Sequence, residues 1–249
     1  MIRPADLARR FYPFFAKPRP SFLLAEILAS MSRNKPVHIL QVGANDGVLY
    51  DPIHETLLRR SNVTATRIEP IVDYFEELKA NCSNIATQVE LFNICIGDED
   101  GVVDIYLPKQ SKLHGLGEKG HGSLTPEAAG RKRENLESRK VLCKSFKSLI
   151  NDMRVPHADV YVSDCEGYDL QLLRKLPVEQ LGVKVIFIEL LCRTVISNED
   201  VANSVKEAVE IVVSKGLNRL IWDGIDFLSW KSPNESKRHQ VEVEGFTTP

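Results

Sequence analysis

Residues 38–51 constrain the fold of this chain more than any other stretch, because a short apolar run leads there into a turn with two glycines. The run ends at Val42 and has the β-rich composition of a strand. Gly43 and Gly47 follow within the turn, and a residue without a Cβ lets the backbone approach a ligand closely. A strand that enters such a turn predicts a ligand cradle.

A helix start follows this turn. Asp51 supplies an N-cap side chain and Pro52 suits the first helical position, so a helix is predicted over residues 53–60. The free N–H groups at the start of a helix are a common binding point for nucleotide-like ligands. Strand, glycine turn and helix together therefore favour a nucleotide-like cofactor.

The turn lacks the dinucleotide fingerprint Gly-x-Gly-x-x-Gly, which packs a pyrophosphate against the helix end. Asn45 and Asp46 stand between the glycines instead, and a carboxylate at this place attracts a cationic ligand. S-adenosylmethionine has a cationic sulfonium and two free ribose hydroxyls, so an acid is expected at the end of the next strand. Residues 64–68 have the pattern of that strand, and Glu69 follows about 20 residues beyond the last glycine.

Three segments, in this order and spacing, resemble the FkbM-type S-adenosylmethionine-dependent methyltransferases. They are residues 42–47 (Val-Gly-Ala-Asn-Asp-Gly), 68–70 (Ile-Glu-Pro) and 164–169 (Asp-Cys-Glu-Gly-Tyr-Asp), and the resemblance covers residues 37–192. It implies a Rossmann-like sheet with the strand order 3-2-1-4-5-7-6. It also implies methyl transfer to a hydroxyl of a sugar, a glycan or a similar small molecule. The cofactor-binding residues that follow from the turn and from this resemblance are Gly43, Ala44, Asn45, Asp46, Gly47, Glu69, Ile96 and Asp164.

The rest of the chain alternates strands and helices, which predicts an α/β fold with a doubly wound, mostly parallel sheet of seven strands. A hairpin at Asp223-Gly224 supplies an antiparallel strand near one edge. Further strands are expected at residues 89–96, 102–107, 141–146, 158–163, 183–190, 217–222 and 225–230, and further helices at 71–81, 147–153, 170–176 and 201–215.

A length of 249 residues suits one domain with additions. Residues 37–231 are expected to form the S-adenosylmethionine-binding methyltransferase domain, and residues 232–249 a polar tail. Residues 1–36 contain no apolar run long enough for a membrane helix and no signal-peptide pattern, so we expect an N-terminal helical extension. It would pack across the sheet edge or over the cofactor mouth, with docking of its aromatic and basic residues onto a membrane surface or a partner as the alternative.

Residues 108–140 form an insert into this domain. Its polar, glycine-rich part contains His121, and a loop of this kind is either unstructured or an active-site lid. The segment 122–124 (Gly-Ser-Leu) resembles one that many family members carry, which favours the lid. The basic residues from 131 to 140 alternate with glutamates and include no aromatic, so they predict a solvated helix and not a nucleic-acid site.

Acids near the ends of two predicted strands are the candidate catalytic groups. Asp164 and Glu166 fall in a tight turn, where Asp169 is interpreted as the N-cap of the next helix. Glu189 ends a strand that is otherwise apolar. A hydroxyl acceptor needs a general base, for which Asp164, His121 and Glu189 are the candidates, with Glu166 as a further catalytic candidate. No spacing requires a metal, although the three acids are of the type that can share one cation.

Bulk composition argues against several classes of function. The chain has 32 basic and 34 acidic residues, so its net charge does not favour nucleic acid or an anionic membrane as a partner. Its five cysteines are scattered without metal-ligand spacing, which favours a reducing, cytoplasmic location. Two other functions stay open, namely methylation of an amine or a nucleic-acid base, and a catalytically silent module that binds a partner. The oligomeric state is left open.

Overall fold

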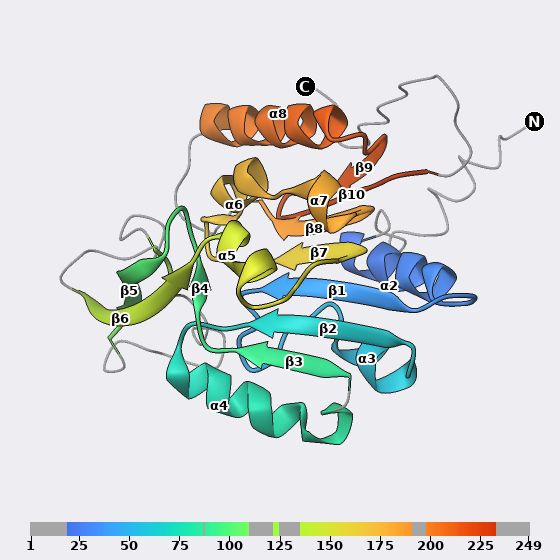
Figure 1. Ribbon diagram of the computed structural model, residues 1–249. Helices are drawn as coiled ribbons and strands as arrows, with labels where there is room; N and C mark the ends of the chain where they lie inside the picture. The colour runs from blue at the N-terminus through green and yellow to red at the C-terminus, as the bar shows by residue number, and fades with distance from the viewer. Residues whose placement is uncertain (1–18, 87, 110–121, 125–134, 191–197, 233–249) are drawn as a thin grey trace, which may run out of the picture.

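The computed structural model describes residues 19–86, 88–109, 122–124, 135–190 and 198–232. Within these ranges, seven strands form one mostly parallel sheet in the order β3-β2-β1-β7-β8-β10-β9 (Figure 1). Counted along the chain, this order is 3-2-1-4-5-7-6, so the predicted doubly wound topology is confirmed. The strands are β1 (Val37–Val42), β2 (Val63–Ile68), β3 (Val89–Phe92), β7 (Val160–Ser163), β8 (Val185–Glu189), β9 (Arg219–Trp222) and β10 (Asp226–Trp230).

Helices cover both faces of this sheet, and none in the described ranges is long and apolar enough to cross a membrane. They are α2 (Pro20–Met31), α3 (His54–Arg59), α4 (Val72–Asn81), α5 (Phe146–Asn151), α6 (Asp169–Lys175), α7 (Val178–Leu181) and α8 (Asn198–Ser214), with a 3-10 turn at Ser83–Ile85.

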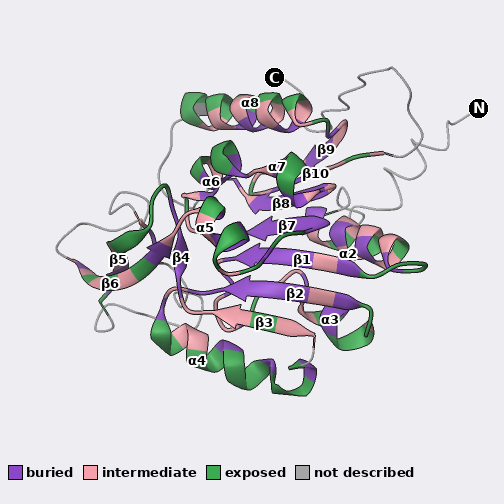
Figure 2. Ribbon diagram, viewed as in Figure 1, coloured by how far each residue is buried: buried purple, intermediate pink, exposed green. Residues whose placement is uncertain are grey.

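The central strands are buried on both faces because successive side chains point to opposite sides of the sheet (Figure 2). Leu40 and Tyr161 pack on one face with α5, α6 and α8, whereas Ile39 and Val160 pack on the other with α2, α3 and α4. Burial of one such aliphatic side chain contributes about 1.5–3 kcal/mol. The apolar side chains of these strands therefore form the core of the fold.

The N-terminal helix α2 lies on a face of the sheet. Its Leu24 and Leu28 are fully buried in the same cluster as Ile39 and Val160, which corrects the expectation of packing across the sheet edge. Ser21, at the start of the helix, lines the cavity described below, in line with the alternative position near the cofactor mouth.

The third predicted strand is split between two sheets, so the single strand predicted over residues 89–96 is wrong. After β3 the chain leaves the main sheet, and β4 (Cys95–Ile96) joins a second sheet of order β4-β6-β5. The amide of Asn93 explains the break, because its Nδ2 donates to the carbonyl oxygens of Glu69 (2.8 Å) and Pro70 (3.1 Å) beyond the end of β2. The Asn93 side chain thus takes the place of the regular backbone hydrogen bonds between the two strands at this point.

The second sheet lies beside the carboxyl ends of the main strands (Figure 1). Its other strands, β5 (Gly101–Pro108) and β6 (Leu136–Lys144), pair along their whole length in antiparallel register. Residues 136–140 are therefore a strand and not the predicted solvated helix. Cross-strand pairing overrides the local charge pattern here, and Arg139 is held by ion pairs with Asp73 (2.7 Å) and Glu137 (2.8 Å).

The remaining elements follow the predicted pattern with shifted ends. β9 and β10 form the predicted hairpin, with Gly224 at a φ of 111° in the turn. The helices after β6 and β7 begin at Phe146 and Asp169, one residue before their predicted starts, and α8 begins at Asn198. Residues 1–18, His121, Cys192 and most of the polar tail lie outside the described residues.

Candidate functional site

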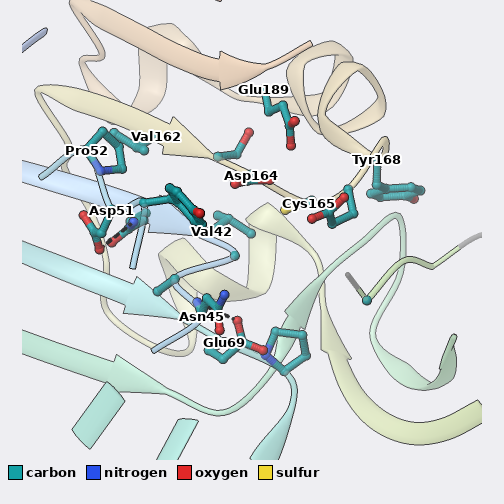
Figure 3. Close-up of a pocket in the computed structure, with 18 of the residues that line it drawn as sticks. Val42, Asn45, Asp51, Pro52, Glu69, Val162, Asp164, Cys165, Tyr168 and Glu189 are labelled. Carbon is teal, nitrogen blue, oxygen red and sulfur yellow. Dashed lines mark hydrogen bonds between the residues drawn. The ribbon is translucent and has the colours of Figure 1, made fainter. Parts of the chain in front are cut away.

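A cavity of about 500 Å³ opens at the carboxyl ends of β1, β2, β7 and β8 (Figure 3). Parallel α/β sheets bind ligands at this edge, where the loops of neighbouring strands diverge. Its walls come from the turn after β1, the residue after β2, the loop after β7 and the end of β8. The second sheet contributes Cys95, Ile96 and Ile105, and the segment after β5 contributes Gly122 and Leu124.

The glycine turn after β1 is built for close backbone contact. The amides of Gly43 and Ala44 both donate to the carbonyl of Ile68 (3.0 Å each), which joins the ends of β1 and β2. Gly43 has a φ of +78°, and a Cβ there would lie 1.9 Å from the carbonyl oxygen of Asp164. Only glycine fits this position, because a side chain would be strained and would strike backbone.

Replacing Gly43 with alanine is expected to lower the free energy of unfolding by roughly 2–5 kcal/mol, the sum of left-handed strain and overpacking. Gly216→Ala is the matched control, because Gly216 has nearly the same φ (+81°) and open space around it. That control should cost only the strain, roughly 1–2 kcal/mol. Urea unfolding of both variants measures the difference, and equal losses would refute the clash with Asp164.

Glu69 follows β2 and points back at the glycine turn (Figure 3). Its Oε2 accepts from the amide of Asn45 (2.9 Å) and its Oε1 from the amide of Ile71 (2.8 Å). The carboxylate is buried, and burial raises its pKa to about 7 against the opposing effect of these two hydrogen bonds. Each oxygen has a second lone pair, so Glu69 can still accept from two ligand hydroxyls.

Other predicted residues of this turn do not line the cavity. Asp46 accepts from the amides of Val48 (2.9 Å) and Leu49 (2.8 Å), and so closes the turn on itself. Gly47 is not among the lining residues either, since it packs near Leu78 and the guanidinium of Arg67. Asp46 and Gly47 therefore support the residues of the turn that do line the cavity.

A buried ion pair that the sequence did not suggest secures the turn. Arg67 on β2 pairs with Asp51, and both side chains are almost fully buried. The Nε of Arg67 also donates to Oε1 of Gln41 on β1 (2.8 Å). Asp51 accepts from the amides of Ile53 (2.7 Å) and His54 (2.9 Å), but the N-cap of α3 is Ile53 and the helix begins at His54. The predicted roles of Asp51 as N-cap and of Pro52 as the first helical residue are therefore wrong.

Three of the predicted acids come together on the opposite wall. Asp164 and Glu166 lie after β7 and Glu189 ends β8, and each offers an oxygen within 4.8 Å of the others. Burial, followed by the negative charge of Asp164, raises the pKa of Glu189 well above its usual range. Glu189 therefore keeps its proton at neutral pH and shares a hydrogen bond with Asp164.

Asp169 does not cap α6, which corrects the predicted role. It is the first residue of that helix, is 1% exposed, and turns back toward the preceding loop. Its Oδ1 accepts from the hydroxyl of Ser163 (2.5 Å) and its Oδ2 from the amide of Cys165 (2.9 Å). The local pattern of an acid before a helix did not distinguish these two arrangements.

The remaining predicted site residues are Ala44, Asn45, Ile96 and His121. Ala44, Asn45 and Ile96 line the cavity, whereas His121 lies outside the described residues. Further lining residues were not predicted as site residues. Leu49, Tyr50, Cys165 and Tyr168 fall within the segments that the sequence analysis singled out, whereas Ser21, Phe187, Ile225 and Asp226 reach the cavity only through the fold.

The part of the chain that forms most of this site matches a known protein domain. Residues 41–194 match the methyltransferase FkbM domain. No curated protein sequence gives a significant match. Solved structures that the chain resembles include the METTL16 MTase domain, with 11% identity over 93% of this chain and 70% of that chain (TM-score 0.47).

Two further solved structures give similar values. The Methanococcus jannaschii fibrillarin pre-rRNA processing protein has 16% identity over 86% of this chain and 76% of that chain (TM-score 0.47). A SAM-dependent O-methyltransferase from Thermotoga maritima has 10% identity over 93% and 72% (TM-score 0.45).

Proposed function

This chain belongs to the methyltransferase FkbM domain family, and on that basis we propose that it methylates a hydroxyl oxygen of a sugar, a glycan or a similar small molecule. The cofactor of the family is S-adenosylmethionine. The observation that carries the choice of a hydroxyl is the close pair of Asp164 and Glu189 at the cavity, because an alcohol requires a base.

The residues of the cavity fit a cationic, ribose-bearing cofactor. Glu69 has free lone pairs for two hydroxyls, and Gly43, Ala44 and Asn45 of the glycine turn line the cavity beside it. Among the described residues that line the cavity, none is Lys, Arg or His, while six are acids. These acids are Asp51, Glu69, Asp164, Glu166, Glu189 and Asp226. Asp51 is paired with Arg67 and Glu189 keeps its proton, but the remaining acids still favour a ligand with positive charge.

The bound cofactor supplies a methyl group that its sulfonium already activates. The protein must therefore align the acceptor, exclude water and accept the proton of the hydroxyl as the C–O bond forms. Tyr50 and Ile225, at the rim, offer exposed apolar surface on which a bulky acceptor can lie. The acid wall would then face the acceptor hydroxyl.

Asp164 is the general base in this proposal. Two carboxyl groups this close cannot both be charged without a large repulsion, so they share one proton. Because the pKa of Glu189 is raised by burial and by Asp164, the proton stays on Glu189. Asp164 remains the charged member of the pair, hydrogen-bonded to Glu189, and can accept the proton of the acceptor. Glu166 adds negative charge beside it.

A panel of hydroxyl acceptors tests the proposal. We expect the protein to bind S-adenosylmethionine in calorimetry and to transfer a labelled methyl group to a hydroxyl of at least one sugar, glycan or polyketide-type alcohol. Amines and nucleobases serve as comparison acceptors. Label on an amine or a base would replace the hydroxyl assignment, and cofactor binding without product on any acceptor would favour the silent binding module.

A further inference from the structure

We propose that Asp169 is a positioning residue that holds Asp164 in place for catalysis, an inference that rests on the proposed function of Asp164 as base. The carboxylate of Asp169 binds Ser163 and Cys165, which are the residues immediately before and after Asp164. One buried side chain thus holds both neighbours of the candidate base.

The backbone of Asp164 is also fixed from the side of β1. Its amide donates to the carbonyl of Val42 (3.1 Å), and its carbonyl oxygen fills the space that a Cβ on Gly43 would need. With the strand side fixed in this way, the freedom that remains lies in the turn that follows Asp164. That turn is where Asp169 acts, through the amide of Cys165.

The turn after Asp164 is strained and needs a restraint. Glu166 has a φ of +49° and Gly167 a φ of +90°, and a residue with a side chain is unfavourable in this left-handed region. The Glu166 carboxyl is one of the three acids gathered at the cavity. The hydrogen bonds that Asp169 accepts from Ser163, six positions before it, and from Cys165, four positions before it, close this turn, so they can hold a conformation that the local sequence alone disfavours.

Burying the Asp169 carboxyl group beside other acids costs folding free energy, which argues that Asp169 does more than begin α6. Burial, and then the charge of Asp164, raise the pKa of Asp169 to about 7. The ionisable groups that act on it or on its neighbours are Tyr161 of β7, Asp164, Cys165 and Glu166 of the loop, and Glu189 of β8. A helix start would be served by an exposed serine or asparagine without this repulsion.

Three variants separate the effect of the two hydrogen bonds of Asp169 from the effect of its negative charge. Asp169→Ala removes both bonds. Asp169→Asn can keep them, because its carbonyl accepts from the Cys165 amide and its amide donates to the Ser163 hydroxyl, while the charge is lost. Ser163→Ala removes one bond and keeps the charge.

We expect Asp169→Ala to lose about 10–100-fold in turnover, the usual effect of removing a supporting contact, while its affinity for S-adenosylhomocysteine stays near wild type. Asp169→Asn should retain most turnover, with the acidic limb of its pH–rate profile near that of the wild type. Because the pKa of Asp169 is raised to about 7, its carboxyl is already mostly neutral over that limb, and the substitution removes little charge there. Ser163→Ala should give an intermediate loss of turnover.

Hydrogen exchange of the Cys165 amide in the cofactor-free protein gives a readout that needs no acceptor. Exchange should be slow in the wild type and in Asp169→Asn, and at least about tenfold faster in Asp169→Ala, where the amide loses its partner. Unchanged exchange in Asp169→Ala would overturn the proposal. So would wild-type turnover in that variant, or a loss of turnover that merely follows a loss of cofactor affinity.

A failure of the proposed function can be told apart from a failure of the inference about Asp169. If the wild type methylates no hydroxyl, the base assignment falls, whereas fast exchange in Asp169→Ala would still show that Asp169 holds the loop around Asp164.

Discussion

Replacing Glu69 with alanine is expected to weaken S-adenosylmethionine binding about 100-fold, or about 2.7 kcal/mol, which is within the range for hydrogen bonds to a charged group. The variant loses the carboxylate that faces the cavity and also leaves the amides of Asn45 and Ile71 without their acceptor. Isothermal titration calorimetry on both proteins measures the change. Unchanged affinity would remove Glu69 from the cofactor site.

Glu90→Ala is a suitable control for this experiment, because Glu90 lies on the neighbouring strand β3 with an exposed side chain. It should bind the cofactor as the wild type does. A second readout is the stability of the cofactor-free protein. Since the pKa of Glu69 is raised to about 7, the folded state binds its proton more tightly than the unfolded state. Stability therefore falls as pH rises from about 5 to 8, and Glu69→Ala should reduce this fall.

Asp164→Asn is expected to slow methyl transfer by 10²–10⁴-fold, the usual contribution of a general base, with cofactor affinity nearly intact. Asparagine keeps the size of the side chain but cannot accept the hydroxyl proton. Single-turnover transfer of a labelled methyl group to the best acceptor of the panel measures the chemical step apart from product release.

Asp98→Asn provides the matched control, because Asp98 is exposed in the turn after β4 and does not line the cavity. The control should turn over at the wild-type rate. A wild-type rate in Asp164→Asn itself would discard Asp164 as the base, and attention would then move to Glu189 and to His121.

The parts of the site that were predicted from sequence depend on local patterns. Gly43 was found because a strand before a glycine turn is a contiguous signal, and Glu69 because it ends the next short strand at a typical spacing. The central strands were found for a similar reason, since runs buried on both faces are apolar throughout. Such features need no knowledge of which distant segments meet.

The parts that were missed depend on distant contacts. Arg67 is a charged residue within a strand, and its burial makes sense only once Asp51 and Gln41 are placed beside it. The break after β3 depends on bonds from Asn93 to the end of β2. Asp169 has the pattern of a helix cap, and only the folded loop shows that it bonds to Cys165 instead.

The second sheet bears on how proteins of this family can diversify. Its strands β5 and β6 bond to each other along their length and, in the described part of the chain, not to the seven-stranded sheet. Gly122 and Leu124, which lie between these two strands in the chain, reach the cavity from outside the seven-stranded sheet, and Gly122 lies against Ile71, whose amide donates to Glu69. Under the proposed function, exchanging Gly122 and Leu124 is expected to change which alcohols are accepted, while Glu69 stays on the other wall of the cavity.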